Sequence, residues 1–166
     1  MQLLRDVKWV LYVSELTAFP YPEGKARVYR VGTDGQQTVV ADGFTQLTDL
    51  EFDAQGNLYV LQYANESAWK GNLDGSLIQV APDGTRTTLV SGNGLESATA
   101  LTIGPDNAIY ITNKGDRPGV GQVLRVENPE AVPEPSSFLG VLAIGSLGFG
   151  SLLLRRKQKQ LANIPH

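Results

Sequence analysis

Acidic side chains are the residues of this sequence with the clearest potential for chemistry. Glu15, Asp49, Glu51 and Glu66 would offer carboxylate oxygens to a divalent cation if the fold brought them together. The positions equivalent to Glu15 and Asp49 in the repeats described below carry amides or alanine instead. We therefore expect four solvated residues at strand edges, and we predict no metal site, no catalytic residue and no cofactor.

Two Asp-Gly steps also resemble cation-binding loops at first sight. They occur in NLDGS at 72–76 and in PDGT at 82–85. Neither has the acid spacing of a calcium loop that ends in Glu. We interpret both as turns, because Asp and Gly tolerate the left-handed backbone that tight turns need.

The composition excludes most nucleophilic and imidazole chemistry. The chain has no Cys, which excludes thiolate zinc sites, disulfides and a Cys nucleophile. Its one His is the terminal residue His166, so we expect no His-dependent triad and no two-His metal site. The expectation is a protein that is not an enzyme.

Aromatic residues suggest either a sugar-binding platform or a packed core. Tyr12, Tyr59 and Tyr110 occupy the same place in successive repeats, which favours core packing. Trp69 lies in a long insertion at 64–75. We expect it to be exposed there, and it is the aromatic residue to test for ligand binding.

Strand-forming segments recur along the chain. LYVSE at 11–15, LYVLQ at 58–62 and IYITN at 109–113 are rich in β-branched and aromatic residues. Segments 28–43 and 77–92 match position by position around an Asp-Gly step. The repeat therefore predicts a four-stranded meander of about 45–50 residues, the period of a β-propeller blade. In the complete unit we expect strands at 47–53, 58–63, 76–81 and 86–90.

These units predict an all-β fold, a partial and open β-propeller of about three blades. The blades are expected at 8–43, 47–92 and 98–128, within a domain of residues 1–130. Closed propellers typically have about 4–8 blades, and an open arc leaves strand edges exposed. We therefore expect a chain whose N-terminus is truncated.

Charge is distributed unevenly. The net charge is −3, but the C-terminal segment 155–166 holds four basic residues and no acid. The remainder has ten basic residues against seventeen acidic ones. An acidic body disfavours binding to a phosphate backbone, so we expect no nucleic-acid partner.

The C-terminal apolar run at 138–154, FLGVLAIGSLGFGSLLL, contains no charge. A helix of about 20 apolar residues spans a bilayer, so we predict one C-terminal transmembrane α-helix here. A Pro/Ser spacer at 131–137 precedes it, and a basic cytoplasmic tail at 155–166 follows. Basic residues favour the cytoplasmic side, which places the N-terminal body outside. The basic cluster that sets this topology is Arg155, Arg156 and Lys157.

The order of these elements resembles the PEP-CTERM sorting signal of bacteria that make extracellular polymers. The resemblance rests on VPEPSS, the apolar helix and RRK, across residues 132–159. It implies recognition by exosortase, a membrane protease-transpeptidase, with the helix holding the substrate in the membrane until processing. The implied location is the cell envelope, with release to the surface after processing. The implied sorting motif is Val132, Pro133, Glu134 and Pro135.

The repeats resemble the ScyD/ScyE family of cyanobacterial proteins, which are relatives of NHL/SMP-30-like propellers. The segments that carry the resemblance are GSLIQVAPDGTRTTLVSG, ALTIGPDNAIYITN and GVGQVLRV. Proteins of that family are exported, commonly carry the same tail and are named from a gene cluster for the pigment scytonemin. The resemblance implies no catalytic residue.

The sequence as a whole predicts an exported, non-catalytic propeller that its tail delivers to the cell envelope, linked to an extracellular pigment or polymer. Two alternatives remain open. One is a metal-dependent, lactonase-like propeller enzyme, for which Glu15 and Asp49 are the candidate ligands. The other is a binding module that stays anchored in the membrane because its tail is not cleaved.

Overall fold

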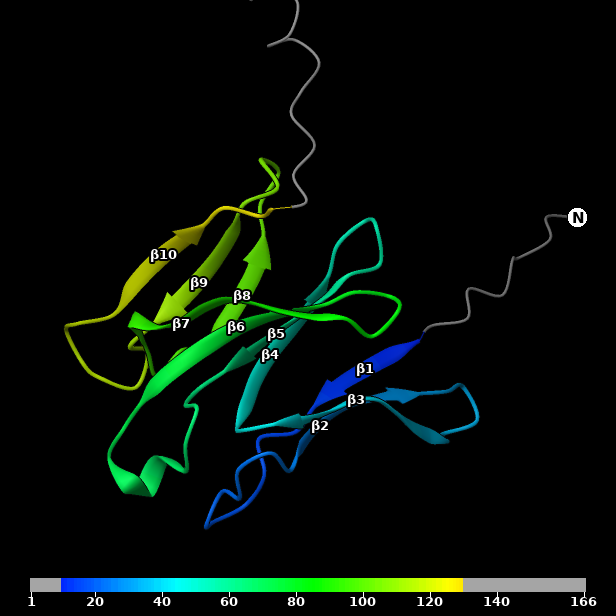
Figure 1. Ribbon diagram of the computed structural model, residues 1–166, viewed down its shortest axis with the longest axis horizontal. Coiled ribbons are helices and arrows are strands. Elements are labelled where there is room, and N and C mark those ends of the chain that lie inside the picture. Colours follow the sequence, from blue (N-terminus) through cyan, green and yellow to red (C-terminus); the bar gives the residue numbers. More distant parts are fainter. Residues whose placement is uncertain (1–9, 130–166) are drawn as a thin grey trace, which may run out of the picture. The chain divides into compact units, whose positions relative to one another are not determined.

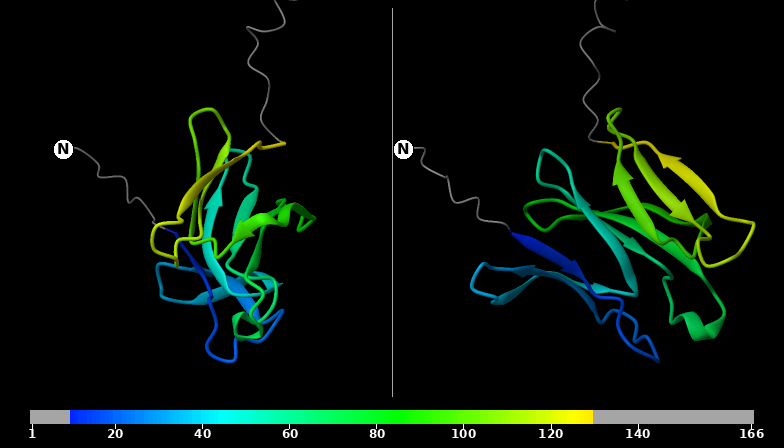
Figure 2. Two further views of the ribbon diagram at one scale, coloured as in Figure 1. Left: turned by 90° about the vertical axis from the view of Figure 1, so that its left-hand side faces the viewer. Right: turned by 180° about the vertical axis from the view of Figure 1, so that it is seen from behind.

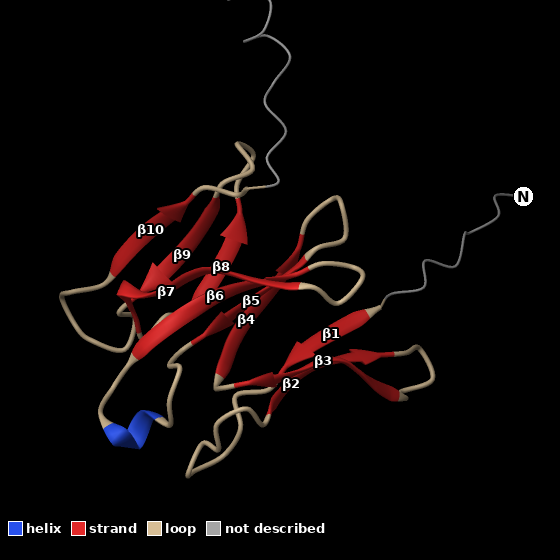
Figure 3. Ribbon diagram, viewed as in Figure 1, coloured by secondary structure: helices blue, strands red, loops and turns tan. Residues whose placement is uncertain are grey.

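A computed structural model of the chain describes residues 10–129. Within this range the chain forms ten β-strands and one short 3-10 helix, arranged as three antiparallel sheets (Figures 1 and 3). The prediction of an all-β fold is therefore confirmed.

The first sheet contains β1 (Leu11–Ser14), β2 (Ala26–Val31) and β3 (Gln37–Phe44). The second contains β4 (Leu47–Phe52), β5 (Leu58–Gln62), β6 (Asp74–Val80) and β7 (Arg86–Glu96). The third contains β8 (Ala100–Ile103), β9 (Ile109–Asn113) and β10 (Gln122–Val126). The 3-10 helix is η1 (Ala68–Lys70).

Each sheet is a meander in which consecutive strands are neighbours. The four strands of the second sheet begin within two residues of their predicted starts, but β7 continues to Glu96, beyond its predicted end at residue 90. The interpretation of NLDGS as a turn is wrong, because Asp74 and Gly75 begin β6. Gly75 is required there for a different reason: a Cβ atom at this position would clash with the carbonyl oxygen of Gln62 in the neighbouring strand.

Aspartates fix the hairpin turns. Asp83 Oδ1 accepts a hydrogen bond of 2.8 Å from the backbone N–H two residues later, and Asp34, Asp53 and Asp106 make the equivalent bond at 3.0–3.2 Å. This is the local bond that favours Asp in turns. For PDGT the interpretation as a turn is confirmed.

Strand register shows that the sheets repeat one pattern. Leu11 pairs with Val31, Leu58 with Val80, and Ile109 with Val126. The strand pairs β1 and β2, β5 and β6, and β9 and β10 are therefore equivalent. By the same register β4 corresponds to β8, and β3 corresponds to β7.

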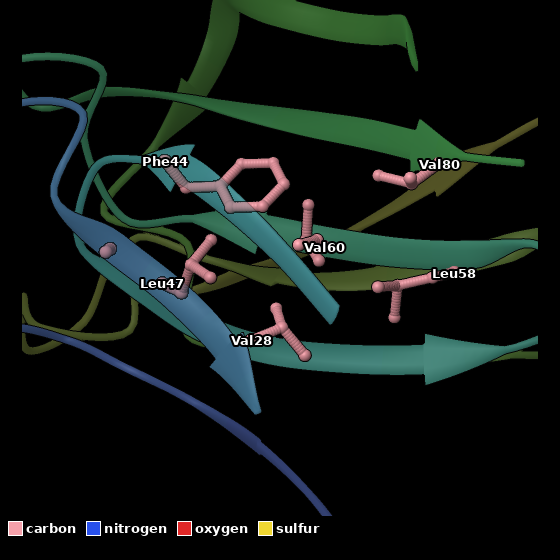
Figure 4. Packing of buried hydrophobic residues seen from close by; sticks show 8 residues of the cluster. Val28, Phe44, Leu47, Leu58, Val60 and Val80 are labelled. Atoms are coloured by element: carbon pink, nitrogen blue, oxygen red, sulfur yellow. The ribbon is translucent and has the colours of Figure 1, made fainter. Parts of the chain in front are cut away.

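Two apolar cores hold the sheets face to face, with the second sheet between the other two (Figure 2). The first core lies between the first and second sheets (Figure 4). The second core lies between the second and third sheets. Alternate residues of β5 point to opposite faces, so this strand contributes to both cores. Residues of the first core include Val28, Phe44, Leu47, Leu58, Val60 and Val80. Residues of the second include Tyr59, Leu61, Leu77, Leu101, Ile109 and Ile111.

Tyr59 is the largest fully buried side chain of the second core. Its hydroxyl lies 2.9 Å from Asn128 Oδ1 and 3.1 Å from Asp53 Oδ2, and it accepts a hydrogen bond from Gln79 Nε2. Burial, together with the hydrogen bond to the Asp53 carboxylate and its charge, raises the pKa of Tyr59 to about 12. The neutral phenol therefore links a strand of the second sheet to the segment that follows β10.

The prediction that the repeated tyrosines are core residues is confirmed for Tyr59 alone. Tyr12 and Tyr110 are only half-buried. Tyr12 stacks against Phe52 with ring centroids 4.6 Å apart, and the Tyr110 hydroxyl donates to Asp106. For Tyr110 the difference arises because, within residues 10–129, no sheet packs on the face of the third sheet that carries it.

The arrangement of the three sheets as blades around one axis stays a prediction. The expected transmembrane helix at 138–154, the spacer at 131–137 and the basic tail lie outside the described residues. Within residues 10–129, no helix is long and apolar enough to span a membrane.

Candidate functional site

The four acidic candidates do not form a common site. Asp49 Oδ2 accepts a hydrogen bond of 2.8 Å from the Leu101 N–H, and Glu51 Oε2 accepts one of 3.0 Å from the Ile103 N–H. These two donors belong to the edge of β8 that has no partner strand in the third sheet. The expectation of solvated residues is therefore wrong for Asp49 and Glu51, which connect the second sheet to the third.

Glu15 and Glu66 lie in other surroundings. Glu15 Oε2 is 3.4 Å from the Tyr29 hydroxyl, which donates to it. The Glu66 side chain is exposed, while its backbone carbonyl accepts a hydrogen bond from Gln46. Among residues 10–129, no group of three or more acidic or His side chains is placed to hold a metal ion.

A pocket of about 340 Å³ opens where the first strands of the second and third sheets begin and β1 ends. Its lining has no charged side chain. Tyrosine rings and aliphatic groups supply apolar surface, and an amide and two threonine hydroxyls supply polar groups. This mixture suits a neutral ligand with both an apolar face and hydrogen-bonding groups. The lining residues are Leu16, Tyr21, Gln46, Thr48, Tyr63, Ala68 and Thr99.

Hydrogen bonds hold the inner wall of the pocket in place. Gln46 is buried, has a positive φ of 48°, and donates from Nε2 to the Glu66 carbonyl at 2.9 Å. The backbone carbonyl of Gln46 accepts a hydrogen bond of 2.9 Å from the Tyr63 N–H. Thr48 Oγ1 donates to the Ala98 carbonyl at 2.9 Å, which joins β4 to the residues before β8. The wall is therefore preorganised by contacts between distant segments.

The outer wall combines the loop before β2 with the insertion at 64–75. Ser67 Oγ donates to the Tyr21 carbonyl at 2.7 Å, and the Ser67 N–H donates to Glu23 Oε1 at 3.0 Å. Lys70 Nζ lies 2.7 Å from the same carboxylate oxygen. The hydrogen bond from Lys70, followed by that from the Ser67 N–H, holds the pKa of Glu23 below its usual range.

Two exposed aromatic residues adjoin residues that line the pocket. Phe19 is 74% exposed and meets Tyr21 edge to face, with ring centroids 6.1 Å apart. Trp69 is 60% exposed in η1, beside the lining residue Ala68. The prediction that Trp69 is exposed is confirmed. Sequence reasoning missed Phe19 and Tyr21, although aromatic residues in a proline-containing loop were a usable signal.

Tyr63 closes another side of the pocket. Its hydroxyl donates to Asp116 Oδ2 at 3.0 Å. Desolvation pushes the pKa of Asp116 upward, but the hydrogen bond from Tyr63, the nearby Ser97 side chain and the Arg117 charge outweigh it and lower the pKa. At neutral pH the charged Asp116 therefore orients the Tyr63 ring.

A second pocket, of about 350 Å³, is more polar. It lies between the end of the 64–75 insertion and the end of β7, and its lining includes Asp74, Glu96 and Arg117. Arg117 Nη2 lies 2.7 Å from Glu96 Oε2. Because this ion pair occupies the groups that would bind a charged ligand, the first pocket is the better candidate site.

The predicted sorting residues lie outside the described part of the chain: Val132, Pro133, Glu134, Pro135, Arg155, Arg156 and Lys157. Evidence for the segment that contains them comes from comparison with known protein families. Residues 131–157 match the PEP-CTERM protein-sorting motif. The C-terminal segment therefore contains a PEP-CTERM protein-sorting motif. This motif implies recognition by exosortase, a membrane-anchored C-terminal region and targeting to the cell envelope or the exterior.

No curated protein and no solved structure gives a significant match to the chain. The resemblance of the repeats to the ScyD/ScyE family therefore has no support from a homologue and stays a prediction.

Proposed function

We propose that this chain is an exported envelope protein whose β-sheet body is a non-catalytic, propeller-type binding module. The observation that carries the proposal is the PEP-CTERM motif at residues 131–157. In this proposal exosortase recognises Val132 and the Pro133-Glu134-Pro135 element. The apolar segment 138–154 holds the chain in the membrane until processing, and the basic cluster from Arg155 to Lys157 keeps the C-terminal end in the cytoplasm.

The uncharged pocket supports a binding role for the body. Its lining is uncharged and includes the rings of Tyr21 and Tyr63, and the exposed Phe19 meets Tyr21 edge to face. Ring faces pack well against the apolar face of a flat or cyclic ligand, while hydroxyl and amide groups orient its polar edge. A neutral unit of an extracellular polymer, or a neutral aromatic pigment, has this chemistry. The link to such a ligand rests on the resemblance to ScyD/ScyE proteins.

The sorting step is tested by expressing the full chain in cells with and without exosortase and determining the mass of its mature C-terminus. We expect loss of the segment after the motif only where exosortase is present. Glu134→Gln is expected to prevent this loss. Glu127→Gln, an equivalent change in an exposed residue before the motif, serves as the matched control. An intact C-terminus with unchanged membrane retention in both strains would support a permanently anchored protein instead.

A further inference from the structure

Side-chain alternation assigns the two faces of the first sheet. Val28 belongs to the core between the first and second sheets, and Ser14 is its cross-strand partner. Cross-strand partners lie on the same face of a sheet, and adjacent residues lie on opposite faces. Leu11, Val13 and Val31 therefore lie on the face turned away from the second sheet.

That outer face carries residues whose equivalents are buried. Leu11 is 60% exposed and Val13 is 41% exposed. The equivalent residues of the second sheet, Leu58 and Val60, are 5% and 0% exposed, because they pack in the first core. Apolar groups that recur at core positions yet lie exposed mark a surface that another element covers.

The third sheet has a complementary outer face. Ile109 and Ile111 of β9 point into the second core, so Tyr110 and Thr112 lie on the opposite face. Val123, the cross-strand partner of Thr112, is 72% exposed. The equivalents of these outer residues in the second sheet are all buried: Tyr59, Leu61 and Leu77.

We propose that the outer face of the third sheet packs on the outer face of the first sheet in a second copy of this chain. The existing contact between the second and third sheets is the template. There Tyr59, Leu61 and Leu77 pack on a face that includes Ile109 and Ile111. In the contact between copies, Tyr110, Thr112 and Val123 of one copy take the place of Tyr59, Leu61 and Leu77. The residues Leu11, Val13 and Val31 of the other copy take the place of the face that includes Ile109 and Ile111.

The two faces are different, so the contact is head-to-tail, and such contacts generate either closed rings or open filaments. The described residues of each copy form three sheets, so those of two copies supply six, which falls within the range of about 4–8 blades that closes a propeller. A third copy would exceed that range. The second copy is therefore bound through two identical interfaces in a closed dimer.

Charge does not oppose this contact. Arg125, on the outer face of the third sheet, lies 3.0 Å from Asp106 Oδ2 and also pairs with Glu127. On the first sheet the outward Glu15 accepts the Tyr29 hydroxyl. The charges of the third sheet are therefore paired within that sheet, and on the first sheet the Glu15 charge interacts with Arg27, which lies on the same face. Burial of the apolar pairs between the two faces drives association.

Single cysteines test the contact directly, because the natural chain has no Cys. Val13→Cys places a thiol on the first outer face and Thr112→Cys places one on the third. The full-length variants are purified in mild-detergent micelles and treated with a short bis-maleimide. We expect the mixture of the two variants to form several-fold more cross-linked dimer than either variant alone. Thr33→Cys, in an exposed hairpin turn of the first sheet, is the control and is expected to cross-link with neither.

The double variant carrying Val13→Cys and Thr112→Cys tests ring closure. We expect a cross-linked product that stops at the dimer, and a ladder of larger products would overturn the closed ring. Preferential cross-linking of Val13→Cys to itself would overturn the head-to-tail geometry. Equal cross-linking of Thr33→Cys would assign association to the C-terminal segment.

The unmodified chain is examined by analytical ultracentrifugation in the same micelles. A dimer is expected, and Leu11→Glu is expected to convert it to a monomer while the far-UV circular dichroism spectrum stays that of the wild type. A wild-type monomer would overturn the proposal and leave the two faces to further sheets of a longer polypeptide.

Discussion

Removal of the two carboxylates that join β4 to β8 is expected to weaken the contact between the second and third sheets. Asp49 and Glu51 accept the N–H groups of Leu101 and Ile103 at 2.8 Å and 3.0 Å. A hydrogen bond to a charged group contributes about 1.5–3 kcal/mol. Both side chains are half-buried, so the lower end applies to each. We expect the double substitution Asp49→Ala, Glu51→Ala to lower the free energy of unfolding by about 2–4 kcal/mol.

Two measurements on the full chain in mild-detergent micelles check this expectation. Urea unfolding followed by far-UV circular dichroism gives the change in free energy. Amide hydrogen exchange at Leu101 and Ile103 gives the local effect, because both N–H groups lose their acceptor. Asp42→Ala is the matched control, since the Asp42 carboxylate is exposed and lies 3.8 Å from Arg86, and such surface changes usually stay within about 0.5 kcal/mol. The reasoning is refuted if the double variant behaves like this control and the two amides exchange at the wild-type rate.

Three further substitutions test the core, a close backbone approach and the pocket wall. The pKa of Tyr59 is raised from 10.0 to about 12. The contribution of its neutral phenol to the free energy of unfolding is therefore complete below pH 10 and is lost as pH rises toward 12. The loss amounts to roughly 3 kcal/mol, and Tyr59→Phe is expected to flatten the alkaline part of a plot of unfolding free energy against pH. Gly75→Ala is expected to cost about 1–3 kcal/mol, because its Cβ would clash with a backbone carbonyl of β5. Gly121→Ala, which meets nothing within 4 Å, is its control, and equal denaturation midpoints would contradict the clash. Ser67→Ala removes the 2.7 Å bond to the loop before β2, so trypsin should cleave after Lys70 faster than in the wild type, and an unchanged rate would show that this bond does not hold the insertion.

The strands of the second sheet were predictable because their signals are local. Alternation of apolar and polar residues in β4, and the Asp-Gly step at Asp83, depend only on neighbours in the chain. Gly75 misled the prediction because the same dipeptide signal also occurs where a strand passes close to a neighbouring carbonyl. The pocket was not predicted, since its lining residues come from segments that lie far apart in the chain.

The repeats in the sequence were sufficient to predict an all-β fold, and the C-terminal motif was sufficient to indicate targeting to the cell envelope or the exterior. Only the tertiary structure decided what equivalent residues do. Tyr59 and Tyr110 occupy the same position in their sheets, yet Tyr59 is buried and Tyr110 is not. The Asp49 carboxylate accepts a hydrogen bond from the N–H of Leu101, which is 52 residues away in the sequence. The physical reason is that burial and hydrogen bonding depend on which sheet packs on a given face, and a local pattern carries no information about that neighbour.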